Sequence, residues 1–521
     1  MNQLAKQTVK RVATGVDVFP LVSIAIPNHR RPHLLKRVLH GLSQLDYPAF
    51  EIVVVGDQPS IQDYGLPGDW ASLIRYSQFV EPNICKSRNI AISLASGEVV
   101  AFCDDDGVPE PNWLRQLVVP FTDKRVGAVA GTVRGADGVR VDWGGGHFDR
   151  SGEEVPVPMP KGIQIVDAQT QLSTNTFLGL MGVNTAFRRE ALLSVGGFDE
   201  AIRYYLDETD MALRLAEAGW STAIAPAAEV HHLHEVNASR GSLRTPRNLV
   251  QIAASKAYFC HRHMAEGDVK SELERFRLTR LADMDPYLRL GVLRAAGRRD
   301  LEQQLERGLK EGLTRTQNTP LPKAQEKPGF QRFSPARRVR ALRIALVTGW
   351  GLGRTAKLRS AARRLAAAGH RVSCFSFSSG PHPLTVTFED GVWLHTGGTW
   401  RLPRRLRGLK ACLRRVRAWA EVDRTVRTRG YDLILSAGSV PDPDAQRLAA
   451  VPGLPRLTAV PLGMKGQAFI AASHQIAAFL SKSPLDETAL GRLDQAPDTQ
   501  EMERIDGQEG QEDPLMTLGR A

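Results

Sequence analysis

The sequence has few cysteines and no long apolar run. Its five cysteines, at positions 85, 103, 260, 374 and 412 of 521 residues, lie far apart, and no Cys-x-x-Cys pair occurs. This spacing excludes a disulfide framework and favours a reducing environment. No stretch reaches the roughly 18 to 20 apolar residues of a membrane-spanning helix, and the N-terminal segment lacks the apolar core of a signal peptide. We therefore expect a cytoplasmic protein, with peripheral binding to the inner face of the membrane as the alternative.

The charge is unevenly distributed. Lys and Arg total 68 against 56 Asp and Glu, a net charge of +12. Much of the excess lies between Arg332 and Arg429, whereas the C-terminal tail is acidic. A basic surface indicates an anionic partner. The Arg-rich run 401–430 has the composition of a solvated helix face, but its apolar residues at helical spacing also allow binding to an anionic membrane surface. Nucleic acid ranks last, because few aromatic residues are available there for base stacking.

The first half of the chain alternates strand-like and helix-like segments. Apolar runs at 21–27, 50–56 and 98–103 predict buried strands, and the segments 33–45, 83–96 and 109–121 between and after them predict helices. This order favours an α/β fold with a doubly wound sheet, in which ligands bind beyond the carboxyl ends of the strands. The Gly- and Pro-rich stretch 142–162 predicts a long functional loop. A helix over 204–220 and a strand over 221–235 are expected to follow.

Changes in composition predict four regions. A first domain is expected over 1–265, a helical and linker region over 266–340, a second Rossmann-like α/β domain over 341–480, and a disordered acidic tail over 481–521.

Three consecutive aspartates, Asp104 to Asp106, directly follow the predicted strand 98–103. Like charges at a strand end need a counter-charge, typically a metal ion or a helix N-terminus. Asp104 and Asp106 have the D-x-D spacing of two oxygen ligands that hold a divalent cation together with water and a substrate diphosphate. The alternative is a solvated acidic turn before a helix.

A second acidic group lies roughly 100 residues later, at the start of the predicted helix 204–220. Asp207 is expected to cap this helix, with Asp210 completing a capping-box-like pair. Glu208 is then free to act as a general base, and its acidic neighbours should raise its pKa. His232 and His234 alternate with His231 along the following strand, so that one histidine could contribute to a metal site.

The order of these motifs resembles that of family 2 glycosyltransferases over about residues 20 to 240. The resemblance implies a GT-A fold, a nucleotide-diphosphate-sugar donor, Mg²⁺ or Mn²⁺, and inversion at the anomeric carbon. The motifs that carry it are VSIAIPNHRRP, FEIVVVGDQPS, NICKSRNIAISLASGEVVAFCDDDGVPEPNWL, NTAFRREALLSVGGFDE, YYLDETDMALRLAEAGW and EVHHLH.

The resemblance also implies a role for each matching residue. In the family, the catalytic base belongs to an adjacent Glu-Asp pair. Here the order is reversed, Asp207 then Glu208, and Glu208 is favoured over Asp207 as the base. One departure concerns Gly56, which stands where the family usually has an acidic residue, so that base recognition rests on Asp57 alone. The implied donor-binding residues are Pro27, Asn28, Asp57, Arg88, Asp104 and Asp105, and the implied metal ligands are Asp104, Asp106 and His232, with His231 as the alternate.

The segment from about 341 to 470 resembles, more loosely, the N-terminal half of a GT-B glycosyltransferase. The chain ends before the nucleotide-binding half of such an enzyme could fit, so we expect this domain to be noncatalytic and to bind an acceptor or a partner. Its turn with Gly351 and Gly353 lacks the third glycine of a dinucleotide-binding motif.

The leading hypothesis is a metal-dependent inverting glycosyltransferase for glycan or polysaccharide biosynthesis, with a glycan, glycolipid or protein as acceptor. A nucleotidyltransferase is the alternative enzyme, although no Gly-rich loop with a lysine for a triphosphate follows the first strand. A noncatalytic nucleotide-sugar-binding scaffold is the third hypothesis.

Overall fold

The chain divides into two compact units, residues 1–341 with 377–430 and residues 342–376 with 431–521. The computed structural model describes residues 19–57, 61–66, 68–135, 137–233, 241, 245–321, 326–333, 342–348, 355–367, 369–377, 384–397, 424–425, 428–431, 433–437 and 458–460. Within these residues, no helix is both long and apolar enough to cross a lipid bilayer.

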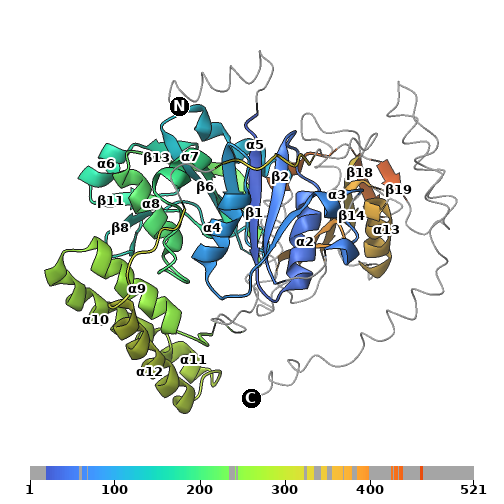
Figure 1. Ribbon diagram of the computed structural model, residues 1–521. Helices are drawn as coiled ribbons and strands as arrows, with labels where there is room; N and C mark the ends of the chain where they lie inside the picture. The colour runs from blue at the N-terminus through green and yellow to red at the C-terminus, as the bar shows by residue number, and fades with distance from the viewer. Residues whose placement is uncertain are drawn as a thin grey trace. The chain divides into compact units, whose positions relative to one another are not determined.

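The first unit is built on a mixed ten-stranded sheet (Figure 1). Its strands are β1 Val22–Asn28, β2 Phe50–Gly56, β3 Arg75–Gln78, β4 Val99–Phe102, β5 Gly107–Pro109, β6 Val126–Arg134, β7 Val141–Trp143, β10 Gln164–Val166, β12 Thr185–Arg188 and β13 Ser221–His232. The main order is β10-β13-β6-β12-β4-β1-β2-β3, with β5 paired to β13 and β7 to β6. β2, β1 and β4 are parallel neighbours, whereas β12 is antiparallel to β4 and β6. The predicted α/β class is confirmed, and the antiparallel pairing of β12 makes the sheet mixed.

The central strands are buried along their whole length, which explains their continuous apolar sequences. Every residue of β1, β2 and β4 is buried, as expected of strands covered on both faces. The rings of Phe102, Phe187 and Phe198 pack edge to face within this core. The connecting helices are α2 Pro32–Leu42, α3 Trp70–Leu73, α4 Ile84–Leu94, α5 Trp113–Leu117, α7 Arg189–Ser194 and α8 Asp207–Glu217.

Two local predictions are wrong. The stretch 142–162 is not one long loop, because β8 His147–Asp149 and β9 Glu154–Val155 form a small sheet with β11 Thr176–Leu178. Gly152, at φ 79°, makes the tight turn between β8 and β9, so this glycine marks a hairpin. The helix predicted over 109–121 is shorter than expected. Only α5, Trp113–Leu117, is α-helical, and Pro120 lies in the 3₁₀ turn Val119–Thr122 that follows it.

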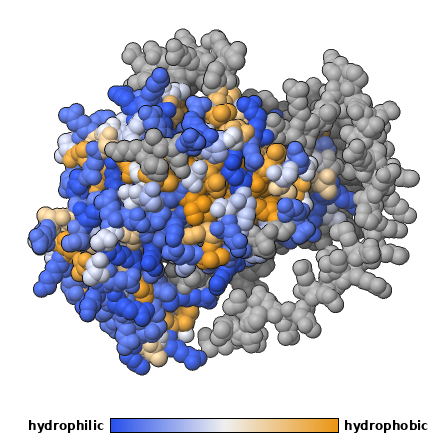
Figure 2. Space-filling view, in the orientation of Figure 1, coloured by the Kyte–Doolittle hydropathy of each residue, from blue (hydrophilic) through white to orange (hydrophobic). Residues whose placement is uncertain are grey.

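Four helices follow the sheet: α9 Val250–His263, α10 Glu266–Ala282, α11 Asp285–Arg289 and α12 Ala295–Gly312. Figure 1 shows α9, α10 and α12 packed side by side, and they share a core that includes Ala253, Phe276 and Leu305. The face of this bundle seen in Figure 2 is largely hydrophilic, as its many charged residues predict.

The first unit also contains an antiparallel hairpin, β16 Thr385–Glu389 with β17 Val392–Gly397. Asp390 and Gly391 connect the two strands with positive φ angles of 49° and 77°. Positive φ at both central residues is the conformation that favours an Asp-Gly turn between twisted strands.

The second unit contains a parallel sheet in the order β15-β14-β18-β19. Its elements are β14 Arg343–Thr348, α13 Thr355–Ala367, β15 Arg371–Phe377, β18 Leu433–Ala437 and β19 Thr458–Val460. The resemblance of this region to GT-B enzymes stays a prediction. Several predicted features lie outside the described residues: Gly351, Gly353, His234, most of the Arg-rich run and the acidic tail 481–521.

Candidate active site

The carboxyl ends of β1, β2 and β4 meet at one edge of the sheet, because these strands are parallel neighbours. Pro27 and Asn28 end β1, and the three aspartates follow β4. Asn28 Nδ2 donates a hydrogen bond of 2.6 Å to Asp105 Oδ2. The topology therefore brings the first strand into direct contact with Asp104 to Asp106, the acidic loop, at the edge where ligands bind in such sheets.

Arg31 supplies a counter-charge to the aspartates that sequence reasoning missed. Its Nη2 lies 2.5 Å from Asp105 Oδ1, and its Nη1 lies 3.5 Å from Asp106 Oδ2. Burial raises the pKa of Asp105 to about 7, even though Arg31 and the hydrogen bond from Asn28 act in the opposite direction. The only signal in the sequence was the basic pair that follows Asn28.

Asp57 lies just beyond the end of β2 and accepts a hydrogen bond of 2.9 Å from the backbone N–H of Arg30. Gly56 precedes Asp57 and lies so close to Asn28 that a Cβ at position 56 would overlap the backbone oxygen of Asn28. The close approach of β1 and β2 therefore explains why position 56 carries no acidic side chain.

Arg88 joins the two acidic groups of the sequence. It projects from α4 and is 3% exposed, with its Cζ 5.6 Å from the ring centre of Phe102 and 5.3 Å from that of Phe198. Its Nη2 lies 2.9 Å from Glu208 Oε1 and 3.7 Å from Asp104 Oδ1, and its Nη1 donates to Asp207. One guanidinium thus holds together carboxylates from the loop after β4 and from α8.

The start of α8 differs from the expected cap. The N-cap residue is Leu206, and Asp207 is already helical. Tyr205 and Leu206 have φ angles of 77° and 65°, which are strained for residues with side chains. This turn leaves the carboxylates of Asp207 and Glu208 free to pair with Arg88.

Asp210 does not complete a capping pair either. Its Oδ2 accepts a bond of 2.7 Å from Arg214, and its Oδ1 lies 2.8 Å from His263 Nε2 and 3.2 Å from Arg262. Asp210 therefore ties α8 to α9. It takes no part in the cluster that Arg88 forms with Asp104, Asp207 and Glu208, which we call the Arg88 cluster.

The pKa values of the neighbouring Asp207 and Glu208 shift in opposite directions. Burial and the negative charge of Glu208 raise the pKa of Asp207 well above its usual range. Burial acts the same way on Glu208, but Arg88 and the hydrogen bond to Asp207 outweigh it and lower the pKa of Glu208. The expectation that acidic neighbours would raise the pKa of Glu208 is therefore wrong.

Gly182 is a further residue that the sequence did not single out. It begins the 3₁₀ turn Gly182–Asn184 and lies against the ion pair between Arg88 and Glu208. A Cβ at this position would overlap both Glu208 Oε1 and Arg88 Nη2. The cluster therefore needs a residue without a side chain here.

The two histidines of β13 point to opposite sides, as alternation along a strand requires. His232 Nε2 lies 3.3 Å from Asp106 Oδ1. His231 is buried, and its Nε2 lies 2.8 Å from Glu110 Oε1. The structure thus places His232 beside the acidic loop and places His231, the alternate ligand, against a different carboxylate.

The residues around the acidic loop fit a divalent cation that is also bound by a substrate. Asp104 Oδ1 is buried and accepts no hydrogen bond from any described residue, because Arg88 Nη2 is 3.7 Å away, so this oxygen could bind a cation. Asp106 and His232 supply further ligand atoms of suitable chemistry. Across the described residues, no three His, Cys, Asp or Glu side chains are already arranged as a complete metal site. Mg²⁺ and Mn²⁺ need only one or two carboxylates when substrate phosphates and water complete the coordination.

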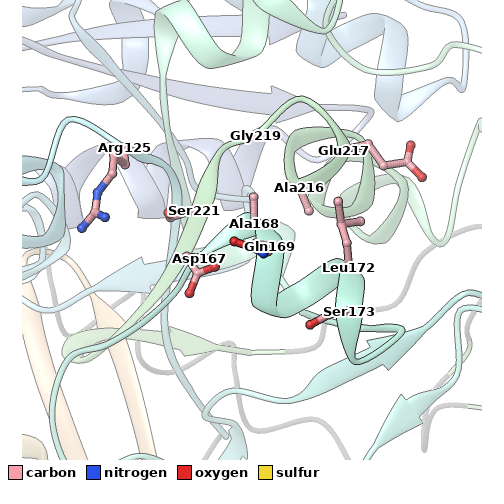
Figure 3. Close-up of a pocket in the computed structure, with 10 residues that line it drawn as sticks. All are labelled: Arg125, Asp167, Ala168, Gln169, Leu172, Ser173, Ala216, Glu217, Gly219 and Ser221. Atoms are coloured by element: carbon pink, nitrogen blue, oxygen red, sulfur yellow. The ribbon is translucent and has the colours of Figure 1, made fainter.

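A separate hollow of about 680 Å³ lies away from these residues (Figure 3). α6 Ala168–Ser173 and the end of α8 line it, together with Arg125 and Ser221. Ser221 begins β13, whereas His232 ends it. This hollow therefore lies at the opposite end of β13 from the acidic cluster.

Comparisons with known proteins find similarity to glycosyltransferases. The sequence model of "Glycosyl transferase family 2" matches residues 23–196. The O-antigen biosynthesis protein RfbC of Myxococcus xanthus is 31% identical over 244 residues, which cover 44% of this chain and 18% of that protein. The probable glycosyltransferase YdaM of Bacillus subtilis is 23% identical over 240 residues, which cover 43% of this chain and 53% of that protein.

Among solved structures, the mannosyltransferase PcManGT of Pyrobaculum calidifontis, in complex with GDP-Man and Mn²⁺, is 17% identical. The match covers 60% of this chain and 94% of that chain, with a TM-score of 0.33. The chain spans about a fifth of the length of RfbC and about half of that of YdaM. Residues 23–196, which lie in the first unit, are therefore similar to family 2 glycosyltransferases.

Proposed function

We propose that this protein is a metal-dependent inverting glycosyltransferase that moves a sugar from a nucleotide-diphosphate-sugar to an acceptor hydroxyl in polysaccharide biosynthesis. The observation that carries the proposal is the contact of Arg88 with Asp104, Asp207 and Glu208. A transferase needs a group that binds the leaving diphosphate and a base that activates the acceptor, and both must flank one reacting carbon. The Arg88 cluster brings two such groups together. Asp104 would hold the cation that binds the diphosphate, and Glu208 would be the base.

Glu208 is the better candidate for the base. Its side chain is 18% exposed, whereas that of Asp207 is 5% exposed, so Glu208 is more accessible to an acceptor. Its lowered pKa keeps the carboxylate ionised at neutral pH and able to accept a proton. Asp207, with its raised pKa, serves to orient Arg88 and Glu208.

On the donor side, we assign Pro27, Asn28 and Asp57 to the nucleotide pocket and Asp104 to Asp106 to the diphosphate. Asn28 and Arg31 fix the acidic loop through Asp105. A divalent cation bound at Asp104 and Asp106, with His232 as a further ligand, would neutralise charge on the departing diphosphate.

The proposed reaction is a single in-line displacement. Glu208 accepts the proton of the acceptor hydroxyl as that oxygen forms a bond to the anomeric carbon. The bond between the anomeric carbon and the diphosphate oxygen breaks, and the nucleoside diphosphate leaves with the electron pair. The configuration at the anomeric carbon is inverted because the acceptor attacks opposite the leaving group. We propose a glycan, glycolipid or protein acceptor; the glycolipid would be met at an anionic membrane surface.

The test is the release of nucleoside diphosphate from nucleotide sugars in the presence of Mn²⁺, measured for the wild type and Glu208→Gln. Loss of a general base costs about 10²- to 10⁴-fold in turnover. We expect such a loss in Glu208→Gln, with Mn²⁺-dependent donor binding retained. Glu217→Gln is the matched control, because Glu217 lies at the other end of α8 and pairs with Arg150.

The products of the same assay separate the alternatives. Release of pyrophosphate would identify a nucleotidyltransferase, and donor binding without turnover would identify a scaffold. A Glu208→Gln variant that turns over at the wild-type rate would contradict the assignment of the base.

A further inference from the structure

Two arginines far along the chain bind a carboxylate next to the acidic loop. Glu110 directly follows β5 and is fully buried. Its Oε1 accepts a bond of 2.7 Å from Arg424 Nη1, and its Oε2 accepts one of 2.7 Å from Arg429 Nε. Both arginines are almost fully buried, at 5% and 7% exposure, so neither lies on the solvated helix face expected of the Arg-rich run.

The same arginines reach β13. Arg424 Nη1 lies 2.7 Å from Glu229 Oε2, and Arg424 Nη2 lies 3.3 Å from His231 Nε2. His231 in turn contacts Glu110 at 2.8 Å. The network therefore connects the residue after β5 with two residues of β13. Buried charges of this kind persist only when each is paired.

Apolar contacts from the hairpin β16–β17 accompany the ion pairs. Val108, the middle residue of β5, packs in one cluster with Phe388 and Trp393. Arg429 Cζ lies 4.0 Å from the ring centre of Trp393. At the hairpin turn, Gln44 Nε2 donates a bond of 2.8 Å to the backbone oxygen of Gly391. β5 is thus held by contacts from β13, from the hairpin, and from Arg424 and Arg429.

β5 and β13 are the strands that bring Asp106 and His232 together. Gly107, the first residue of β5, follows Asp106 and pairs with His232 in the antiparallel register. The backbone N–H of Leu233 donates a bond of 3.1 Å to the backbone oxygen of Asp106. Any shift of β5 against β13 would therefore change the separation between Asp106 and His232.

We infer that Arg424 and Arg429 are positioning residues, which hold β5 on β13 and thereby fix the geometry of Asp106 and His232. The hairpin 384–397 and the two arginines are then a required part of the glycosyltransferase unit rather than a separate accessory. The meaning of this geometry for donor binding rests on the proposed function, but the positioning itself does not.

The test compares full-length wild type with Arg429→Lys, which keeps the charge but loses the planar fork that binds Glu110. Hydrogen exchange followed by mass spectrometry should show the amides of residues 104–110 and 229–233 exchanging about tenfold faster or more. Arg315→Lys is the matched control, because Arg315 binds Ala201, Gln251 and Glu311 instead. In this control, exchange in both segments should stay at the wild-type rate.

Turnover adds a second readout. Because misplacement by about 1 Å can cost about 100-fold in rate, we expect Arg429→Lys to weaken Mn²⁺ binding and to lower kcat in the nucleoside diphosphate assay. Should Arg429→Lys fail to fold, Trp393→Phe weakens the same contact more gently and should give a smaller increase in exchange in the same segments. Unchanged exchange of both segments in a folded variant would overturn the inference. If the wild type releases no nucleoside diphosphate, the proposed function fails, whereas the exchange comparison still decides the positioning.

Discussion

Replacement of Gly182 by alanine is the most local perturbation of the Arg88 cluster. The added Cβ would overlap Glu208 Oε1 and Arg88 Nη2, both closer than the 3.0 Å that real Cβ atoms keep. Ordinary contact begins at 3.4 Å, so each atom would have to move by roughly 1 Å. Arg88 has little room to move, because it is 3% exposed and lies against the rings of Phe102 and Phe198. The displacement should therefore fall mainly on Glu208.

A shift of this size in the base is expected to lower kcat/KM about 100-fold, which corresponds to about 2.7 kcal/mol of transition-state stabilisation. Overpacking should also reduce the free energy of unfolding by about 1 to 3 kcal/mol. The assay is nucleoside diphosphate release with Mn²⁺, using the donor that most raises the melting temperature in a panel of nucleotide sugars. Gly267→Ala is the matched control, because its Cβ would meet no described atom within 4 Å. Retention of more than half of the wild-type kcat/KM in Gly182→Ala would refute the proposed placement of Glu208.

Two further predictions concern stability. Gly56→Asp introduces the acidic residue that is usual in the family. It should lower the free energy of unfolding by about 1 to 3 kcal/mol, because the new Cβ overlaps the backbone oxygen of Asn28. Urea unfolding that matches the wild type would contradict this reason for the glycine. Asp210 has a pKa far below its usual value because Arg214 and His263 outweigh the effect of burial. A depressed pKa stabilises the fold above the unfolded-state pKa of about 3.9, and this contribution is lost as the pH falls below it. The wild type should therefore exceed Asp210→Asn in urea unfolding at pH 7, and the difference should shrink towards pH 3.5; a difference that is independent of pH would contradict the assignment.

Much of the fold follows from local sequence. β2 coincides with the predicted strand 50–56, and β1 differs from its prediction by one residue at each end, because strands buried on both faces are continuous apolar runs. The stretch 142–162 was less predictable, since strands of two or three residues leave no periodic signal. The carboxyl ends of β1, β2 and β4 could be predicted to meet, because that result depends only on topology.

The rest of the site depends on contacts between residues far apart in the chain. Arg31 pairs with Asp105 across 74 positions, and Gly182 touches side chains from α4 and α8. Apart from the basic pair that includes Arg31, nothing in the local pattern distinguishes these residues from other arginines and glycines. Arg424 and Arg429 are harder still, because charged residues are usually exposed and only the tertiary structure shows their buried partners.

The central claim is that the carboxylates after β4 bind a divalent cation together with a nucleoside diphosphate, within reach of Glu208. The most direct measurement is anomalous diffraction from crystals grown with Mn²⁺ and a nucleoside diphosphate. We predict one manganese peak between Asp104 and Asp106, in contact with the diphosphate and on the same side of the sheet as Glu208. A diphosphate bound elsewhere, or a manganese peak that the aspartates do not coordinate, would contradict the account.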